Sequence, residues 1–219
     1  MANPPTVKRP YDARRRRARA EEERRATRSR VVEAARTLFL TKGYVATTMA
    51  EIAQEAGVAL QSVYSAGRSK AELLHLVTDL AVAGDDRDVM LLDRPSYTAI
   101  AEESNRVRQV EMAADLIVAT MERLAPVWVA YREAAAVDAK AAANLVAAHH
   151  RRHQTFAGMI AMLPPDALRQ SHEEATDTAW AIASVDVFLL LRSIRGWDAT
   201  HYAAWIRRTL VEVLLVSDA

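Results

Sequence analysis

The sequence predicts an all-α protein. Only six glycines and seven prolines interrupt 219 residues, of which 51% are hydrophobic, so there is little room for the many turns of a barrel or sandwich. Apolar residues recur every three or four positions, as on one helix face, and no useful length of sequence alternates with the period of a strand. No run approaches the roughly 18 uncharged apolar residues that a membrane span needs. Because cysteine is absent, disulfides and thiolate chemistry are excluded.

The charge of the chain is unevenly distributed. Residues 1–30 hold eleven Lys or Arg and four Asp or Glu residues, a net charge of +7, whereas residues 31–219 carry 18 basic and 24 acidic residues, a net charge of −6. A basic segment on an acidic body suggests an anionic polymer as partner, with a solubilising tail as the alternative. The N-terminal arginines lack a following apolar core, so no secretory signal is expected. We expect a flexible basic arm over residues 1–26 and a cytoplasmic location.

Two short helices are predicted after the first long one. Helical periodicity begins near Arg28, and Gly43 supplies a helix stop. Thr48 and Glu51 form a capping box, in which each side chain satisfies a free backbone amide at the start of a helix. That helix should end near Gly57, and a second one covers residues 60–64. Two short helices across a tight turn that contains glycine are a candidate helix-turn-helix motif.

The next part of the chain is predicted to be helical as well. Ser69 and Glu72 form a second capping box, which opens a helix that reaches Leu80. Pro126 is expected to break or kink the apolar run of residues 112–131, because a proline inside a helix removes a hydrogen bond. An alanine-rich stretch over residues 134–148 has high helix propensity.

Two further helices are predicted near the C-terminus. Ser171 and Glu174 form a third capping box, and the helix it opens should continue to about Arg195. Asp198 can cap a last helix over residues 202–216.

Residues 30–74 resemble a known DNA-binding domain. This segment reads RVVEAARTLFLTKGYVATTMAEIAQEAGVALQSVYSAGRSKAELL and closely resembles the DNA-binding domain of tetracycline-repressor (TetR) family transcription regulators. The residues in family order and spacing are Ala34-Ala35, Leu38-Phe39, Gly43-Tyr44, Thr47-Thr48, Ile52-Ala53, Ala56-Gly57-Val58, Tyr64 and Ser69-Lys70. A weaker resemblance to the regulatory domain lies at Arg195-Gly196-Trp197-Asp198. The resemblance to this family implies a helix-turn-helix domain over residues 27–75 and a helical regulatory and dimerisation domain over residues 76–219.

Two departures from the family pattern concern packing and capping. Ala66-Gly67 stands where the family has an aromatic or His followed by a Phe that packs under the domain, so looser packing is expected there. Ala59 replaces a Ser that caps the second short helix in many members, and the loss of such a cap costs about 1 kcal/mol.

The resemblance implies which residues meet DNA. Thr47, Thr48, Tyr64 and Lys70 are expected to anchor phosphates, in line with the free amides and positive dipole end of a helix N-terminus. The alternatives are a packing role for Tyr64 and a solvated charge for Lys70. Base reading is expected from the second short helix, by Leu60, Gln61, Ser62 and Ser65, because a Gln side chain can pair bidentately with adenine. From charge alone, we expect Arg14, Arg15, Arg16 and Arg17 to follow phosphates or enter the minor groove.

The resemblance also implies a homodimer that binds an operator in double-stranded DNA, and an unknown small-molecule effector. The expected dimer contacts, with burial inside one subunit as the alternative, are Ala179, Ile182, Ala183, Leu189, Tyr202, Trp205, Ile206 and Val213. The expected cavity lining, with plain core as the alternative, is Met112, Leu116, Met121, Trp128, Tyr131, Phe156 and Met159. Arg106, Arg108 and Arg132 are candidates to recognise an acidic ligand, or are solvated charges.

Catalysis and metal binding are not expected. His149 and His153 share a helix face, but flanking arginines oppose a cation and no carboxylate lies adjacent, so we predict no metal site and no cofactor. There is no nucleophile elbow and no glycine-rich phosphate loop, which disfavours an enzyme.

The predicted function is a ligand-responsive regulator, a repressor that binds a palindromic operator as a dimer and is released by its effector. The alternatives are a helical small-molecule-binding or interaction protein with a weakened DNA-binding unit, and a salt-sensitive DNA-coating protein.

Overall fold

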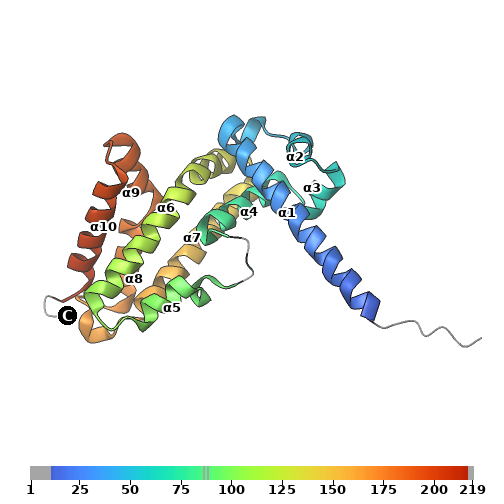
Figure 1. Ribbon diagram of the computed structural model, residues 1–219. Coiled ribbons are helices and arrows are strands. Elements are labelled where there is room, and N and C mark those ends of the chain that lie inside the picture. Colours follow the sequence, from blue (N-terminus) through green and yellow to red (C-terminus); the bar gives the residue numbers. More distant parts are fainter. Residues whose placement is uncertain (1–10, 86, 88, 217–219) are drawn as a thin grey trace, which may run out of the picture.

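The computed structural model describes residues 11–85, 87 and 89–216, and within them the protein is all-α, as predicted (Figure 1). Its described residues form no strand, only an isolated antiparallel bridge between Leu168 and Leu215. The helices are α1 (Tyr11–Ala46), α2 (Met49–Ala56), α3 (Leu60–Ala66), α4 (Lys70–Ala83), α5 (Pro95–Glu102), α6 (Arg106–Val137), α7 (Ala139–Ile160), α8 (His172–Ile182), α9 (Val185–Leu189) and α10 (Ala199–Leu214).

The small N-terminal domain packs α2, α3 and the start of α4 against the second half of α1. Its core holds Phe39, Ile52 and Val63, each at most 2% exposed. The predicted capping box is confirmed, because the Glu51 amide donates to Thr48 Oγ1 and the Thr48 amide donates to Glu51 Oε2. Together these contacts hold α2 and α3 in the predicted helix-turn-helix arrangement.

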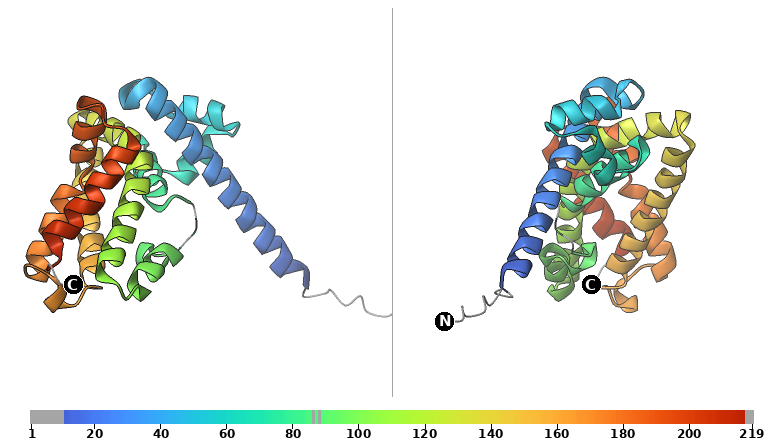
Figure 2. Two further views of the ribbon diagram at one scale, coloured as in Figure 1. Left: turned by 60° about the vertical axis from the view of Figure 1, so that its left-hand side comes forward. Right: turned by 90° about the vertical axis from the view of Figure 1, so that its right-hand side faces the viewer.

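The N-terminal part of α1 differs from the flexible arm expected over residues 1–26. Residues 11–26 are helical and continue directly into the helix predicted from Arg28, whereas residues 1–10 lie outside the described residues. Arg, Ala and Glu are good helix formers, and the Arg19–Glu23 pair at 3.0 Å spans one helical turn. This half of α1 projects away from the bundle in Figure 1 and in the left view of Figure 2.

The larger C-terminal bundle is built around α6, which packs against α1, α4, α5, α7, α9 and α10. Of the break or kink expected at Pro126, the break does not occur, since α6 continues through this residue. Pro126 is exposed, so the disturbed side of the helix faces solvent, where a carbonyl can bond to water. The alanine-rich stretch is divided at Asp138, whose side chain caps α7 by accepting hydrogen bonds from the Lys140 and Ala141 amides.

The helix expected from Ser171 to about Arg195 is interrupted. Its capping box is confirmed, but α8 ends at Ile182 and the chain restarts as α9. The Ser184 hydroxyl accepts a hydrogen bond from the Val187 amide, so this serine offers the backbone a new helix start in place of continuation. A π-helical turn, Leu190–Ile194, then precedes α10, which is capped by Asp198 as predicted.

Candidate DNA interface and effector cavity

The outer face of α3 carries the side chains predicted to read bases. Leu60 and Tyr64 are each 43% exposed, and Gln61 and Ser65 are exposed beside them, while Ser62 is half-buried. Val63 is fully buried on the opposite face and fixes the orientation of the helix. Ala59 provides no side-chain cap, as predicted. This geometry leaves a polar and aromatic surface that no other part of the described chain covers.

The three predicted anchors next to α3 have different environments. Thr48 is exposed at the start of α2. Thr47 is fully buried and donates its hydroxyl to the Gly43 carbonyl at 2.8 Å, so its side chain is not at the surface as a phosphate contact requires. Lys70 is half-buried and donates to the carbonyls of Thr47 at 3.0 Å and Val45 at 3.3 Å. Its ammonium thus joins α4 to the turn before α2.

Gly67 is more tightly packed than the sequence led us to expect. A Cβ atom added at Gly67 would lie 2.5 Å from Leu73 Cδ2. Leu73 is fully buried, so the missing aromatic side chain leaves no loose junction. The glycine instead allows Leu73 to approach the backbone after α3.

The predicted basic contacts lie on the first turns of α1. Arg14, Arg15, Arg16 and Arg17 are all exposed there. Four successive residues of a helix point in different directions, because each residue advances the helix by 100°. The basic surface therefore surrounds the helix and does not form one stripe.

A hydrogen bond links the DNA-binding domain to the bundle. The Tyr44 hydroxyl, at the end of α1, donates to Asp138 Oδ2 at 2.6 Å, and Asp138 also caps α7. The hydrogen bond from Tyr44, followed by those from the α7 amides, lowers the pKa of Asp138. Lys70 lies over the Tyr44 ring, 4.3 Å from its centroid. We call this group, Tyr44, Lys70 and Asp138, the Tyr44 link.

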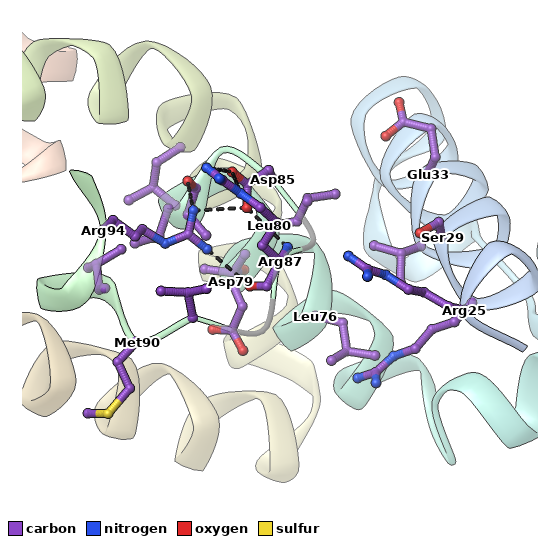
Figure 3. Close-up of a pocket in the computed structure, with 18 of the residues that line it drawn as sticks. Arg25, Ser29, Glu33, Leu76, Asp79, Leu80, Asp85, Arg87, Met90 and Arg94 are labelled. Atoms are coloured by element: carbon purple, nitrogen blue, oxygen red, sulfur yellow. Dashed lines mark hydrogen bonds and ion pairs between the residues drawn. The ribbon is translucent and has the colours of Figure 1, made fainter. Parts of the chain in front are cut away.

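A large open cleft of about 2050 Å³ is bordered by α1, α3, α4, the segment before α5, α6 and α7. Figure 3 shows its outer part, where Arg25 and Ser29 of α1 face Asp85, Arg87 and Arg94. Asp85 pairs with Arg94 at 2.9 Å and with Arg87 at 2.8 Å, which holds the pKa of this carboxyl well below its usual range. These pairs fasten the segment before α5 to the end of α4.

The inner part of the cleft has the predicted apolar walls. Five predicted lining residues border it: Leu116, Met121, Trp128, Phe156 and Met159. Met112 and Tyr131 do not border it, and Tyr131 is fully buried in the core. Sequence reasoning missed α4, which contributes Leu76, Asp79 and Leu80, and it missed Arg151 and Arg152 of α7. The helical periodicity of α4 was visible in the sequence, but the packing of that face against α6 and α7 was not.

Two of the three arginines proposed for an acidic ligand are engaged elsewhere. Arg132 pairs with Asp186 at 2.9 Å on the surface, and Arg106 donates to Gln109 Oε1 at 3.0 Å. Arg108 is also outside the set of residues that border the cleft. Arg152 is the arginine that borders the inner cleft next to its aromatic wall.

The expected dimer contacts are divided between core and surface. Ala179, Ala183, Tyr202 and Ile206 are buried inside the chain, while Ile182, Leu189, Trp205 and Val213 are half-buried. Sequence reasoning missed the π-helical turn before α10, which exposes Leu190 by 56% and Ile194 by 76%. Exposed aliphatic side chains of this size form an apolar patch next to α10.

Two histidines of α7 contact an aspartate and a tryptophan ring and are not arranged as a metal site. His153 Nε2 lies 2.7 Å from Asp177 Oδ1, and the His149 ring packs edge-on against Trp128. Across the described residues, no group of three or more His, Cys, Asp or Glu side chains is placed to hold a metal ion. None of the described helices combines the length and apolar character needed to cross a membrane.

The described chain thus combines a helix-turn-helix arrangement, the motif of many DNA-binding proteins, with a larger helical bundle that borders a cleft. Residues 31–77 match the profile of the family described as bacterial regulatory proteins, tetR family. Residues 31–77 are therefore a TetR-type DNA-binding domain, as the sequence indicated.

Relatives with curated descriptions support the domain, and solved structures support the whole fold. The HTH-type transcriptional regulator TtgR of Pseudomonas putida is 39% identical over 61 residues, which cover 28% of this chain and 29% of that protein. NalD of Pseudomonas aeruginosa, the secondary repressor of the MexAB-OprM multidrug efflux pump, has a TM-score of 0.61 at 18% identity, covering 90% of this chain and 99% of its own. A Saccharomonospora viridis structure, described as a transcriptional regulator in complex with choline, has a TM-score of 0.64 at 17% identity, covering 86% and 97%.

Proposed function

We propose that the protein is a ligand-responsive transcriptional repressor that binds a palindromic operator as a homodimer and is released by a small-molecule effector. The observation that carries this proposal is the connection between the exposed face of α3 and the cleft. The Tyr44 link joins the turn before α2 to the start of α7, and α7 borders the cleft with Arg152 and Phe156. The proposal includes no catalytic step and no cofactor.

In this proposal, α3 enters the major groove. Gln61 reads base edges, assisted by Leu60, Ser62 and Ser65, and Thr48 and Tyr64 contact phosphates on either side. The basic start of α1 adds sequence-independent affinity that falls as salt rises. Lys70 acts through its bonds to the Thr47 and Val45 carbonyls, which fix the turn that presents Thr48.

Effector release follows from linkage between two shapes of the dimer. An effector lowers operator affinity only if it binds the shape unsuited to DNA more tightly than the other. α4 borders the cleft with Leu76 and Leu80 and begins at Lys70. A ligand that shifts α4 or α7 therefore changes the position of α3 relative to its copy across the dimer.

The experiment is a selection of bound sequences from a random duplex pool at near-physiological salt. Full-length protein and a protein that starts at Glu21 are both expected to enrich one palindrome, with weaker and less salt-dependent binding for the shorter protein. Gln61→Ala is expected to reduce discrimination at one base position by about 1–3 kcal/mol. Gln154→Ala, an exposed glutamine on α7, is the matched control and should leave discrimination unchanged.

Two results would reject parts of the proposal. Binding of every sequence equally, and its loss at moderate salt, would indicate a DNA-coating protein that depends on α1. Absence of any enriched sequence would favour a small-molecule-binding protein with a weakened DNA-binding unit, a reading that the uncapped start of α3 at Ala59 supports.

A further inference from the structure

Arg152 is a positive charge in an aromatic part of the cleft wall. Its guanidinium carbon lies 5.1 Å from the Phe156 ring centroid and 5.2 Å from the Trp180 ring centroid. One of its nitrogens donates to the Trp180 carbonyl. The side chain extends from α7 and borders the cleft together with Trp128 and Phe156.

No carboxylate of the described residues pairs with Arg152. In contrast, its neighbour Arg151 lies 3.8 Å from Asp79, and Arg94 lies 2.9 Å from Asp85. The Asp186 carboxylate influences Arg152 electrostatically but pairs with Arg132. Burial lowers the pKa of Arg152 to about 10, which leaves it charged at neutral pH. Arg152 is half-buried, and a partly desolvated charge without a paired carboxylate is unfavourable, so an anion brought by a ligand would reduce that cost.

Arg152 and three residues around it contain polar atoms that are buried without a hydrogen-bond partner in the described chain. These atoms are Arg152 Nε, Trp180 Nε1, the Tyr202 hydroxyl and His149 Nδ1. The Trp180 ring contacts both Arg152 and the His149 ring, and Tyr202 is close enough to Arg152 to interact with it electrostatically. Arg and Trp nitrogens can only donate, so this cluster has an excess of donors. Of its four residues Arg152 alone is among those that border the cleft, so Arg152 is the donor that an accepting ligand group would meet.

Much of the rest of the inner wall is apolar, and its polar members include Thr120, Thr155 and the paired Asp79 and Arg151. Leu80, Leu116, Met121 and Met159 border the same cleft, and methionine side chains adapt to ligands of varied shape. We propose that the cleft binds a hydrophobic organic carboxylate, with the carboxylate at Arg152 and the apolar body between α4, α6 and α7. This inference rests on the proposed function only in treating the cleft as the effector site.

The test compares three ligands of one chain length by calorimetric titration of the full-length protein without DNA. The probes are octanoate, 1-octanol and octyltrimethylammonium. Octanoate is expected to bind at least about tenfold more tightly than 1-octanol, because only octanoate supplies the counter-charge to Arg152. Octyltrimethylammonium is expected to bind more weakly than either. This comparison needs no variant and therefore does not depend on how a substitution folds.

Two neighbouring arginines then provide a matched pair of variants. Arg152→Gln is expected to remove the preference for octanoate over 1-octanol while leaving 1-octanol binding within about twofold. Arg151→Gln is expected to keep the preference, because Arg151 is already paired with Asp79 in the wild type. Arg152→Lys, which keeps the charge but not the planar fork, is expected to fall between wild type and Arg152→Gln.

Several outcomes would overturn the inference: no octanoate binding, equal binding of octanoate and 1-octanol, tighter binding of the ammonium ligand, or equal effects of the two glutamine variants. The regulatory proposal is tested separately. If octanoate binds at Arg152 but leaves operator affinity unchanged, the ligand site stands and the effector role of this ligand class fails.

Discussion

At the scale of single residues, Asp138 serves two partners at once. One oxygen accepts hydrogen bonds from the first amides of α7, and the other accepts from the Tyr44 hydroxyl. All these bonds favour the ionised form, which is why the pKa of Asp138 is lowered in the folded protein. A carboxylate with a lowered pKa stabilises the fold above its unfolded pKa of about 3.9, and this stabilisation is lost as pH falls through the folded value.

We therefore expect Asp138→Asn to change how the free energy of unfolding depends on pH in the acid range. Asparagine is also a good helix cap, so the variant should lose little stability at neutral pH beyond a weaker bond to Tyr44, about 1 kcal/mol. Below about pH 4, the stability of the wild type should fall more steeply than that of the variant. Urea unfolding at several pH values measures the difference in unfolding free energy between the wild type and the variant. The other titratable groups are present in both proteins, so their contributions cancel in this difference. Parallel profiles would contradict the prediction.

Gly67→Ala tests the close approach of Leu73. The added Cβ atom would overlap Leu73 Cδ2, and Leu73 is fully buried, so the variant should lose about 1–3 kcal/mol of unfolding free energy. The double variant with Leu73→Ala should lose less than the sum of the two single changes, because the overlap is then removed. Denaturant titration of the three variants gives the coupling. Strict additivity would mean that the two side chains do not compete for space.

At the scale of helices, α1 and the region before α10 depart most from expectation. Among the described residues α1 begins at Tyr11, because the high helix propensity of its first half supports a helix without any core to pack on. The region before α10 is broken into α9 and a π-helical turn, and this turn leaves Leu190 and Ile194 exposed. If two copies of the chain associate symmetrically, exposed apolar side chains such as these are candidates for burial between them.

Ile194→Glu is expected to weaken the proposed dimer without unfolding the subunit. The side chain is 76% exposed in the single chain, so a charge there should cost little stability, whereas at a dimer face it would be buried against an apolar surface. Sedimentation measurements should show a shift toward monomer. Val146→Glu on α7, at a site 56% exposed, is the control and should leave the assembly unchanged. Equal behaviour of the two variants would place the dimer face elsewhere.

At the scale of the whole molecule, the sequence predicted what depends on local signals. The capping boxes at Thr48 and Ser171 and the Asp198 cap lie where expected, since each depends on residues three positions apart. The burial of Thr47, the packing of Leu73 on Gly67 and the bond between Tyr44 and Asp138 join residues through the tertiary fold. Side-chain identity alone does not predict these contacts. The same holds for Arg152, because its proposed role in ligand binding depends on the absence of a paired carboxylate, which only the tertiary fold determines.

Tyr44→Phe tests communication across the molecule. It removes the hydrogen bond to Asp138 and should reduce the coupling between effector and operator by about 0.5–2 kcal/mol, while each ligand still binds alone. Tyr131→Phe is the control, because that hydroxyl is buried without a hydrogen-bond partner. Operator titrations with and without a releasing ligand measure the coupling. An unchanged coupling in Tyr44→Phe would mean that the signal travels by another route, such as α4.

The position of Arg152 on α7 has a mechanical consequence. An α-helix rises 1.5 Å per residue, so Arg152 and Asp138 are separated by about 21 Å along the axis. If α7 pivots as a rigid rod near Arg152, a tilt of about 3° displaces its capped end by about 1 Å. That distance is enough to break a hydrogen bond of 2.6 Å to Tyr44. A small adjustment around a bound ligand would thus be magnified by the length of the rod before it reaches the DNA-binding domain.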